Sequence, residues 1–253
     1  MAVFNYADSL AADFPHLCVS VVRIEGITGD ARVDAVVERN LEYARRALET
    51  AGNESRLVPV SAWRSAYSAT GTNPTKYRMA AESILRRLRT RNDFPCLHPL
   101  INLCNSLSAR FAIPIAALDA DRISGNLTVR KAAGGEPYHG FDGSVTGMPE
   151  GEVTFLDGAG VAHARRWSHR QSGLSAVSGE TGTAVIFAEA LHEDAKTDLG
   201  RLEGLLLEDL AAVWPDAVMS HALLHGPALR SGFEIGSARA AVTGPAGDRL
   251  SVG

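Results

Sequence analysis

The hydrophobic pattern of this 253-residue chain changes close to Pro114. Before Pro114, apolar residues recur mostly with the period of an α-helix, and after it they gather in short runs bounded by glycine, as is typical of β-strands. The expected helices span residues 30–51, 58–67, 75–91 and 100–111, and the expected strands span residues 113–118, 127–131, 152–157, 160–167 and 183–188. The chain therefore combines a helix-rich first half with a strand-rich second half.

Three further segments complete the expected architecture. The β-branched run Leu17–Ile24 predicts a buried strand, residues 198–214 predict a last helix, and residues 217–224 form an apolar run after it. We expect an α/β (α+β) fold in which mixed sheets pack against helices. Residues 1–230 are expected to form a single domain, and residues 231–253 a loosely ordered C-terminal tail.

The composition excludes several classes of protein. Hydrophobic residues make up 45% and charged residues 21% of the chain, which argues against a disordered, collagen-like or coiled-coil protein. No segment is apolar enough for a membrane span, and the N-terminus does not resemble a signal peptide, so we expect a cytoplasmic protein with no membrane partner. A net charge of -4 argues against broad binding to phosphate backbones. We expect no DNA binding, and any contact with RNA must be local.

Familiar catalytic motifs are missing from the sequence. There is no phosphate-binding loop, no dinucleotide fingerprint and no G-x-S-x-G nucleophile elbow. His221 and His225 have the spacing of zinc ligands on a helix, but the glutamate of the H-E-x-x-H motif is absent and the surrounding run favours a strand. We therefore expect no metal and no cofactor.

Residues 165–171 (RRWSHRQ) form the first cluster of side chains that could bind a ligand. If the preceding strand continues through it, alternation places Arg165 and Trp167 on one face and Arg166 on the other. Arginine, indole and imidazole groups together can hold a carboxylate or phosphate and stack on a flat ring. The alternative is a solvated strand end with one packed tryptophan.

Residues 73–78 (NPTKYR) form the second cluster. Pro74 beside a helix start would leave free backbone N–H groups that suit an anion, and Lys76 and Arg78 would add positive charge. A plain capping turn is the alternative interpretation.

Several segments occur in an order that is typical of one family. They are residues 72–87 (TNPTKYRMAAESILRR), 101–108 (INLCNSLS), 113–119 (IPIAALD), 125–130 (GNLTVR), 151–157 (GEVTFLD) and 181–189 (TGTAVIFAE). The series resembles the B3/B4 domain of the phenylalanyl-tRNA synthetase beta chain, and more closely the free-standing bacterial proteins that consist of that domain. The resemblance covers roughly residues 60–210.

The resemblance implies an editing pocket. In the synthetase, this domain hydrolyses tyrosine that is wrongly attached to the phenylalanine tRNA. Asn105 matches an asparagine of that pocket, and Glu189 falls approximately where the synthetase has the glutamate that binds the tyrosine hydroxyl. Thr181 and Thr183 match the threonines just before that glutamate.

The sequence also departs from the synthetase pattern. Ala116 stands where the synthetase has a histidine, and residues 168–170 (SHR) stand approximately where it has a Gly-Gly pair. We expect His169 to replace the lost histidine as the group that positions water, because a neutral imidazole accepts a proton. The altered residues predict a substrate other than a tyrosyl ester.

The sequence thus predicts a trans-acting hydrolase that deacylates a mischarged aminoacyl-tRNA. The alternative is a module that binds an amino acid or an aminoacyl-tRNA, recruited to a biosynthetic reaction without editing. Its expected partner is the acceptor end of an aminoacyl-tRNA or a free amino acid. The predicted catalytic residues are His169 and Asn105; the predicted substrate-binding residues are Glu189, Glu152, Arg165, Trp167, Arg170, Thr181, Thr183 and Ala116; and the predicted tRNA-binding residues are Lys76, Arg78, Arg86 and Arg87.

Overall fold

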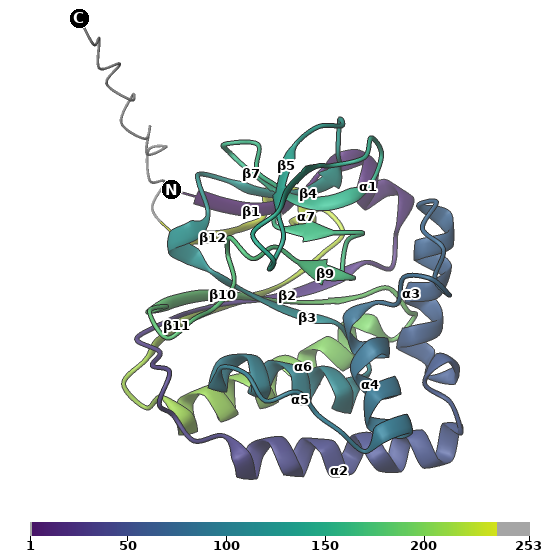
Figure 1. Ribbon diagram of the computed structural model, residues 1–253, viewed down its shortest axis with the longest axis vertical. Coiled ribbons are helices and arrows are strands. Elements are labelled where there is room, and N and C mark those ends of the chain that lie inside the picture. Colours follow the sequence, from purple (N-terminus) through teal and green to yellow (C-terminus); the bar gives the residue numbers. More distant parts are fainter. Residues whose placement is uncertain (1, 237–253) are drawn as a thin grey trace, which may run out of the picture.

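The computed structural model describes residues 2–236, which form helices and strands arranged in layers (Figure 1). The helices are α1 (Asp8–Asp13), α2 (Asp34–Ala51), α3 (Val58–Ala69), α4 (Ala80–Arg91), α5 (Pro99–Phe111), α6 (Ala195–Val213) and α7 (Ala228–Ser231), with 3-10 turns at Glu54–Arg56 and Ala120–Arg122. The strands are β1 (Ala2–Tyr6), β2 (Cys18–Glu25), β3 (Ile115–Asp119), β4 (Leu127–Lys131), β5 (Pro137–His139), β6 (Val145–Gly147), β7 (Val153–Asp157), β8 (Ala164–Arg165), β9 (Arg170–Gln171), β10 (Thr183–Ala190), β11 (Val218–His225) and β12 (Phe233–Gly236). The expected α/β fold class is confirmed.

The central sheet has the strand order β11-β2-β10-β3, and all its pairings are antiparallel. The buried run of β2 pairs along its whole length with β10, so that Val19 lies opposite Glu189. On the other edge of β10, Ala116 of β3 lies opposite Phe187. Helices α2, α4, α5 and α6 lie on one side of this sheet (Figure 1), and the apolar faces of α5 and α6 pack against it.

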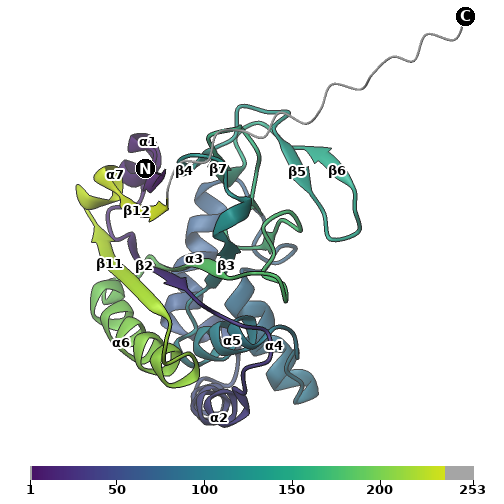
Figure 2. The same ribbon diagram turned by 90° about the vertical axis from the view of Figure 1, so that its left-hand side faces the viewer.

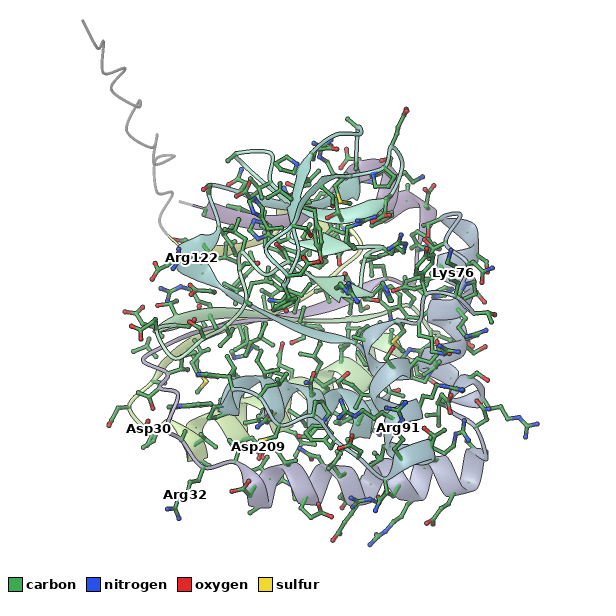
Figure 3. All side chains as sticks on the ribbon, viewed as in Figure 1. Asp30, Arg32, Lys76, Arg91, Arg122 and Asp209 are labelled. Atoms are coloured by element: carbon green, nitrogen blue, oxygen red, sulfur yellow. The ribbon has the colours of Figure 1, made fainter. Side chains whose placement is uncertain are left out.

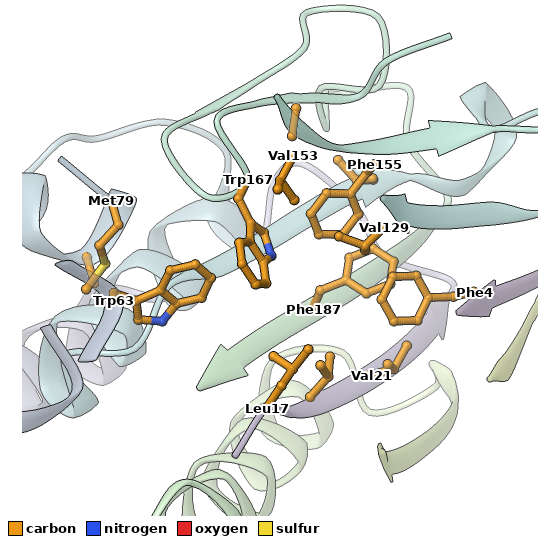
Figure 4. Close-up of a cluster of buried hydrophobic side chains, with 14 of the residues drawn as sticks. Phe4, Leu17, Val21, Trp63, Met79, Val129, Val153, Phe155, Trp167 and Phe187 are labelled. Carbon is orange, nitrogen blue, oxygen red and sulfur yellow. The ribbon is translucent and has the colours of Figure 1, made fainter. Parts of the chain in front are cut away.

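A second sheet, β12-β1-β4-β7, lies on the opposite side of the central sheet (Figure 1). The core between the two sheets contains an aromatic cluster, in which the ring centroid of Phe4 lies 4.4 Å from that of Phe187 and 6.0 Å from that of Phe155 (Figure 4). The β5–β6 hairpin projects from the body beyond β7 (Figure 2). The central sheet is thus covered by helices on one face and by a sheet on the other.

The N-terminal strand β1 was not expected from the sequence. It pairs in parallel with β4 and antiparallel with β12. The expectation of a loose tail is wrong for residues 233–236, because Phe233 and Glu234 pair with β1. The remaining residues of that tail, 237–253, lie outside the described residues.

The predicted helices are confirmed, but those expected from residues 30 and 75 begin later, at Asp34 and Ala80, and the one expected from residue 198 begins at Ala195. The helix expected from residue 75 begins at Ala80, because the Asn73 side chain accepts hydrogen bonds from the backbone N–H groups of Thr75 and Lys76 and holds a separate turn there. Pro74 therefore does not open a helix, and the capping turn is the correct interpretation. No helix among residues 2–236 is long and apolar enough to cross a membrane.

The strand expected over residues 160–167 is much shorter than predicted. It ends at Arg165, because Arg166 and Trp167 have φ angles of 47° and 61° in the left-handed region. Residues other than glycine seldom adopt these backbone angles, and each such residue lowers the stability of the fold by about 1–3 kcal/mol. The expected alternation of Arg165, Arg166 and Trp167 across a strand is therefore wrong.

Candidate active-site pocket

A cavity of about 140 Å³ lies between the central sheet and the β8–β9 turn. Its lining comes from α5, β3, β7, β10 and the turn itself, and it includes Asn105, Ala116, Trp167, His169, Arg170 and Glu189. The apolar part of the lining consists of Ala80, Pro114, Ile115, Leu118, Phe155 and Ala164, and the other polar residues are His163, Ser168 and Gln171. The structure thus brings both predicted catalytic residues and four of the predicted substrate-binding residues into one cavity.

Glu189 is the buried acid of this cavity, with 3% of its surface exposed. Its Oε1 accepts a hydrogen bond from the Tyr6 hydroxyl and another, of 2.7 Å, from Nε1 of Trp167. Burial raises the pKa of Glu189 to about 7, although both hydrogen bonds favour the charged form. The carboxyl group therefore changes charge near neutral pH.

The indole of Trp167 is fixed from several sides. Its ring centroid lies 4.9 Å from that of Trp63 and 5.2 Å from that of Phe14, in edge-to-face arrangements. Its backbone N–H donates to the carbonyl of Val153 at 2.7 Å. Figure 4 shows Trp167 between Trp63 and the aromatic cluster of the core. The left-handed backbone of the turn directs the Trp167 side chain inward. The backbone strain of the turn thus places an indole in the cavity wall.

His169 lines the cavity with a defined tautomer. Its Nδ1 lies 2.7 Å from the carbonyl oxygen of Arg78, and since a carbonyl only accepts, Nδ1 carries the hydrogen. Burial is the largest cause that lowers the pKa of His169 below its ordinary value of 6.5, with Arg166 and Arg170 adding to the effect. The ring is neutral at pH 7, and Nε2, which makes no hydrogen bond within residues 2–236, has a lone pair that can accept a proton from water.

Asn105 and Arg170 are both available to a ligand. Within residues 2–236, the Asn105 amide makes no hydrogen bond, and the exposed Arg170 side chain makes no hydrogen bond or ion pair. Asn105 lies on α5 and Arg170 on the short strand β9, so a helix and a strand place an amide and a cation at the same cavity.

Glu152 and Arg165 support the β8–β9 turn and do not line the cavity. Glu152 Oε1 accepts a hydrogen bond of 2.5 Å from Nε of Arg165 and one of 2.9 Å from the backbone N–H of Arg166. Glu152 Oε2 accepts a further bond of 3.2 Å from the Arg165 guanidinium. Their position indicates that they stabilise the turn that carries Trp167 and His169.

Thr181 and Thr183 also lie away from the cavity. Thr181 is buried and donates to Oδ2 of Asp119 at 2.8 Å. Thr183 begins β10, whereas Glu189 lies six residues further along that strand, about 20 Å away at the usual rise. The sequence places these residues close together, but the extended strand separates them.

The arginines expected to bind tRNA are largely engaged with carboxylates. Arg86 Nη1 lies 3.4 Å from Glu54, Arg87 Nη2 lies 2.5 Å from Asp93, and Arg78 Nε lies 3.8 Å from Glu82. Only Lys76 of the four predicted residues has no ion pair within residues 2–236, and its ammonium lies 5.2 Å from the centre of the Tyr77 ring.

The pairing of Glu54 with Arg86 and Arg89 predicts a stabilising role for these arginines. Burial opposes the charge of Glu54, but the hydrogen bonds from Arg89 and Arg86 hold its pKa below its ordinary range. Glu54→Ala is expected to lower the free energy of unfolding at pH 7 by about 1–2 kcal/mol, discounted because both arginines are partly exposed. Urea unfolding measures this change.

The control for this prediction is Asp93→Ala, which breaks an exposed ion pair with Arg87 and is expected to cost less than about 0.5 kcal/mol. A depressed pKa contributes stability above the pKa of the unfolded carboxyl, and this contribution is lost as the pH falls through the folded pKa. The effect of Glu54→Ala should therefore shrink on acidification. An equal loss at pH 3 and pH 7 would contradict the ion-pair interpretation.

The sequence did not indicate Tyr6 or His163 as members of the site, and it indicated Gln171 only as the last residue of the cluster 165–171. Tyr6 lies in an unpredicted strand and 183 positions before the carboxyl group that it contacts. His163 is fully buried, with Nδ1 2.8 Å from Oγ of Ser175 and Nε2 3.4 Å from Oδ2 of Asp157. Gln171 donates to the backbone carbonyls of Ala117 and Ser175. No motif marks such long-range contacts.

The pair His221 and His225 lies on strand β11, as the apolar run indicated. His221 Nδ1 lies 3.2 Å from Oε1 of Glu203. Among residues 2–236, no group of three or more histidine, cysteine or acidic residues is arranged to hold a metal ion.

The fold and the cavity define an α/β domain with a small, partly polar pocket beside a central antiparallel sheet. A family model described as the B3/4 domain matches residues 62–200, which is more than half of the chain. The chain therefore belongs to the B3/4 domain family, and the family expected from the sequence is confirmed.

A similar solved structure is an N-terminal fragment of the phenylalanyl-tRNA synthetase beta-subunit from Pyrococcus horikoshii. The match has a TM-score of 0.47 and 8% sequence identity, and it covers 89% of this chain and 55% of that chain. This chain thus spans about half the length of the fragment. No curated protein sequence matches the chain.

Proposed function

We propose that this protein is a trans-acting hydrolase that deacylates a mischarged aminoacyl-tRNA. The observation that carries the proposal is one cavity that holds the neutral imidazole of His169, in a fixed tautomer, and the amide of Asn105, which has no hydrogen-bond partner among the described residues. Acyl-ester hydrolysis needs an acceptor for a proton of water and a donor for the developing oxyanion. The size of the cavity suits a small group such as an aminoacyl group, since pockets for drug-sized ligands and cofactors usually measure about 300–1,000 Å³.

In the proposed reaction, Nε2 of His169 accepts a proton from water while the water oxygen forms a bond to the ester carbonyl carbon. The Asn105 amide donates a hydrogen bond to the carbonyl oxygen as its negative charge develops. The bond from the carbonyl carbon to the ribose oxygen then breaks, and the ribose oxygen takes the proton from His169. The products are the free amino acid and the tRNA.

The charges beside the cavity support contact with the acceptor end of the RNA. Arg170 is exposed beside the pocket, and the guanidinium of Arg166 lies 3.7 Å from the centre of the Tyr77 ring. The His169 ring lies 5.4 Å from the same tyrosine, and Lys76 lies beside it. Cations beside aromatic rings suit a phosphate and a base, and a local group of them suffices in a protein of negative net charge.

A panel of correctly and incorrectly charged tRNAs tests this function. The wild-type protein is expected to release the amino acid rapidly from at least one mischarged species. Arg170→Ala is expected to raise KM for that species by about 10-fold with little change in kcat, because it removes one charge-assisted contact to the RNA. Arg32→Ala is the control: Arg32 is exposed and lies near the start of α2, far from Lys76 (Figure 3).

Absence of hydrolysis for every species would contradict the proposed function. Binding of an amino acid by the folded protein in that case, without any effect of tRNA, would favour the binding module. An equal rise in KM for Arg170→Ala and Arg32→Ala would show that the site of contact with RNA is not at the cavity.

A further inference from the structure

Two side chains of the protein already donate hydrogen bonds to one carboxyl oxygen of Glu189, the acid in the cavity. The Tyr6 hydroxyl and the Trp167 indole both donate to Oε1 of Glu189. Oε2 receives no hydrogen bond from residues 2–236. It is also not one of the fully buried polar atoms in these residues. Oε2 is therefore not fully enclosed, and since the rest of Glu189 is buried and the residue lines the cavity, the cavity is the side from which a ligand reaches this oxygen. A ligand therefore meets one free acceptor position on this carboxyl group.

The walls around this oxygen restrict the size of the ligand. Tyr6 and Trp167 are 2% and 1% exposed, and they close the space on the far side of Glu189. An engineered apolar cavity of about 150 Å³ holds one benzene molecule, which is close to the 140 Å³ available here. The cavity must also accept the ester carbonyl and the attacking water. Because the ester carbonyl and the attacking water share this space, we expect an aromatic side chain with a polar substituent to fit poorly.

The chemistry of the free oxygen restricts the side chain further. Most of the nearby wall is apolar, including Ile115, Leu118 and Ala164. A hydroxyl group both donates and accepts, so it pairs with Oε2 whether Glu189 is a carboxylate or a carboxylic acid. An apolar side chain of the same shape would cover this oxygen and leave it without a hydrogen-bond partner.

Resting on the proposed function, we propose that this pocket selects an aminoacyl ester with a short, hydroxyl-bearing side chain of the size of serine or threonine. The internal Tyr6 phenol takes the place beside Glu189 that a phenolic substrate would need. The pocket therefore rejects tyrosyl esters by size and rejects short apolar side chains by the unpaired oxygen.

Two comparisons on the wild-type protein test this selection. Threonyl-tRNA and valyl-tRNA carry side chains of nearly equal shape, and kcat/KM is expected to be at least about 10-fold higher for the threonyl ester, because sites that pair with a hydroxyl discriminate strongly against analogues that lack it. The kcat/KM for threonyl-tRNA is also expected to exceed that for tyrosyl-tRNA by about 100-fold or more. Equal rates within either pair would overturn the inference.

A pair of variants tests the role of the internal phenol. Tyr6→Ala is expected to raise the tyrosyl-to-threonyl ratio of kcat/KM by at least about 10-fold, because it opens the space beside Glu189. Tyr6→Phe keeps the ring and is expected to leave tyrosyl esters excluded. Thermal unfolding checks that both variants are folded. A folded Tyr6→Ala variant with an unchanged ratio would contradict the proposed role of Tyr6.

Failure of the proposed function is distinguishable from failure of this inference. Adenosine analogues that carry threonyl, valyl or tyrosyl groups through a stable 3′-amide report binding without hydrolysis, and calorimetry measures their affinities. Suppose that no ester is hydrolysed but the threonyl amide binds at least about 10-fold more tightly than the other two. The proposed hydrolase activity is then wrong, and the proposed selection of a hydroxyl-bearing side chain is supported. If esters are hydrolysed and the three amides bind equally, the selection is wrong and the hydrolase stands.

Discussion

His169→Ala is expected to lower kcat for deacylation by about 100-fold or more, with little change in KM. The variant removes the proton acceptor Nε2 from the cavity, and general-base groups contribute about 10²–10⁴ to the rate. Single-turnover deacylation of the preferred mischarged tRNA measures the chemical step directly. Added imidazole should restore part of the rate of the variant, which a purely structural role of His169 would not permit.

The pH profile provides a second measurement of this role. Because burial lowers the pKa of His169 below 6.5, the imidazole is neutral over most of the accessible range. The rate is expected to rise through a limb below pH 6.5 as His169 loses its proton, and the variant should lose this limb. His225→Ala, an exposed histidine on β11, is the matched control and should retain the wild-type profile. A wild-type rate in His169→Ala would contradict the proposed mechanism.

Trp63→Ala is expected to lower the free energy of unfolding by about 3–5 kcal/mol. Trp63 is fully buried in α3, and its indole packs edge-to-face against Trp167 and Tyr67. Its Nε1 also donates to the backbone carbonyl of Glu189 at 3.1 Å. The variant leaves a cavity and an unpaired carbonyl at the same place. Urea unfolding followed by circular dichroism measures the loss.

Trp63→Phe separates the two contributions to this loss. Phenylalanine retains much of the buried ring area but lacks the N–H group, so the expected loss is about 1–3 kcal/mol. Because Trp63 contacts both Trp167 and the backbone of Glu189, Trp63→Ala should also weaken discrimination between esters. An unchanged unfolding free energy in Trp63→Ala would contradict the assignment of Trp63 to the core.

Local periodicity predicted the longer elements of the fold. Helices α2, α3 and α5 and strands β2, β4 and β10 follow their hydrophobic patterns to within a few residues, because each buries one face or a continuous apolar run. Strands β1 and β12 were missed, since their short sequences become strands only by pairing with each other and with β4. Their formation depends on contacts that no local window contains.

The candidate site was predictable only in part. Family resemblance and residue chemistry indicated Asn105, His169 and Glu189, and the structure places all three at one cavity. The turn at Arg166 and Trp167 was not predictable, because non-glycine residues with positive φ carry no sequence signal. The partner of Glu189 on β1 was equally hidden, since tertiary packing alone determines that contact.

The first strand of the chain has a consequence for how this site can change. Residues 62–200, which match the family model, contain every residue that lines the cavity, but they do not contain Tyr6, whose hydroxyl donates to the carboxyl group of Glu189. They also lack β2, so a protein reduced to that segment would leave one edge of β10 unpaired over eight residues and prone to aggregate. Under the proposed selection, a substitution that removes the ring at position 6 would alter ligand preference while every residue of the matched segment stayed the same.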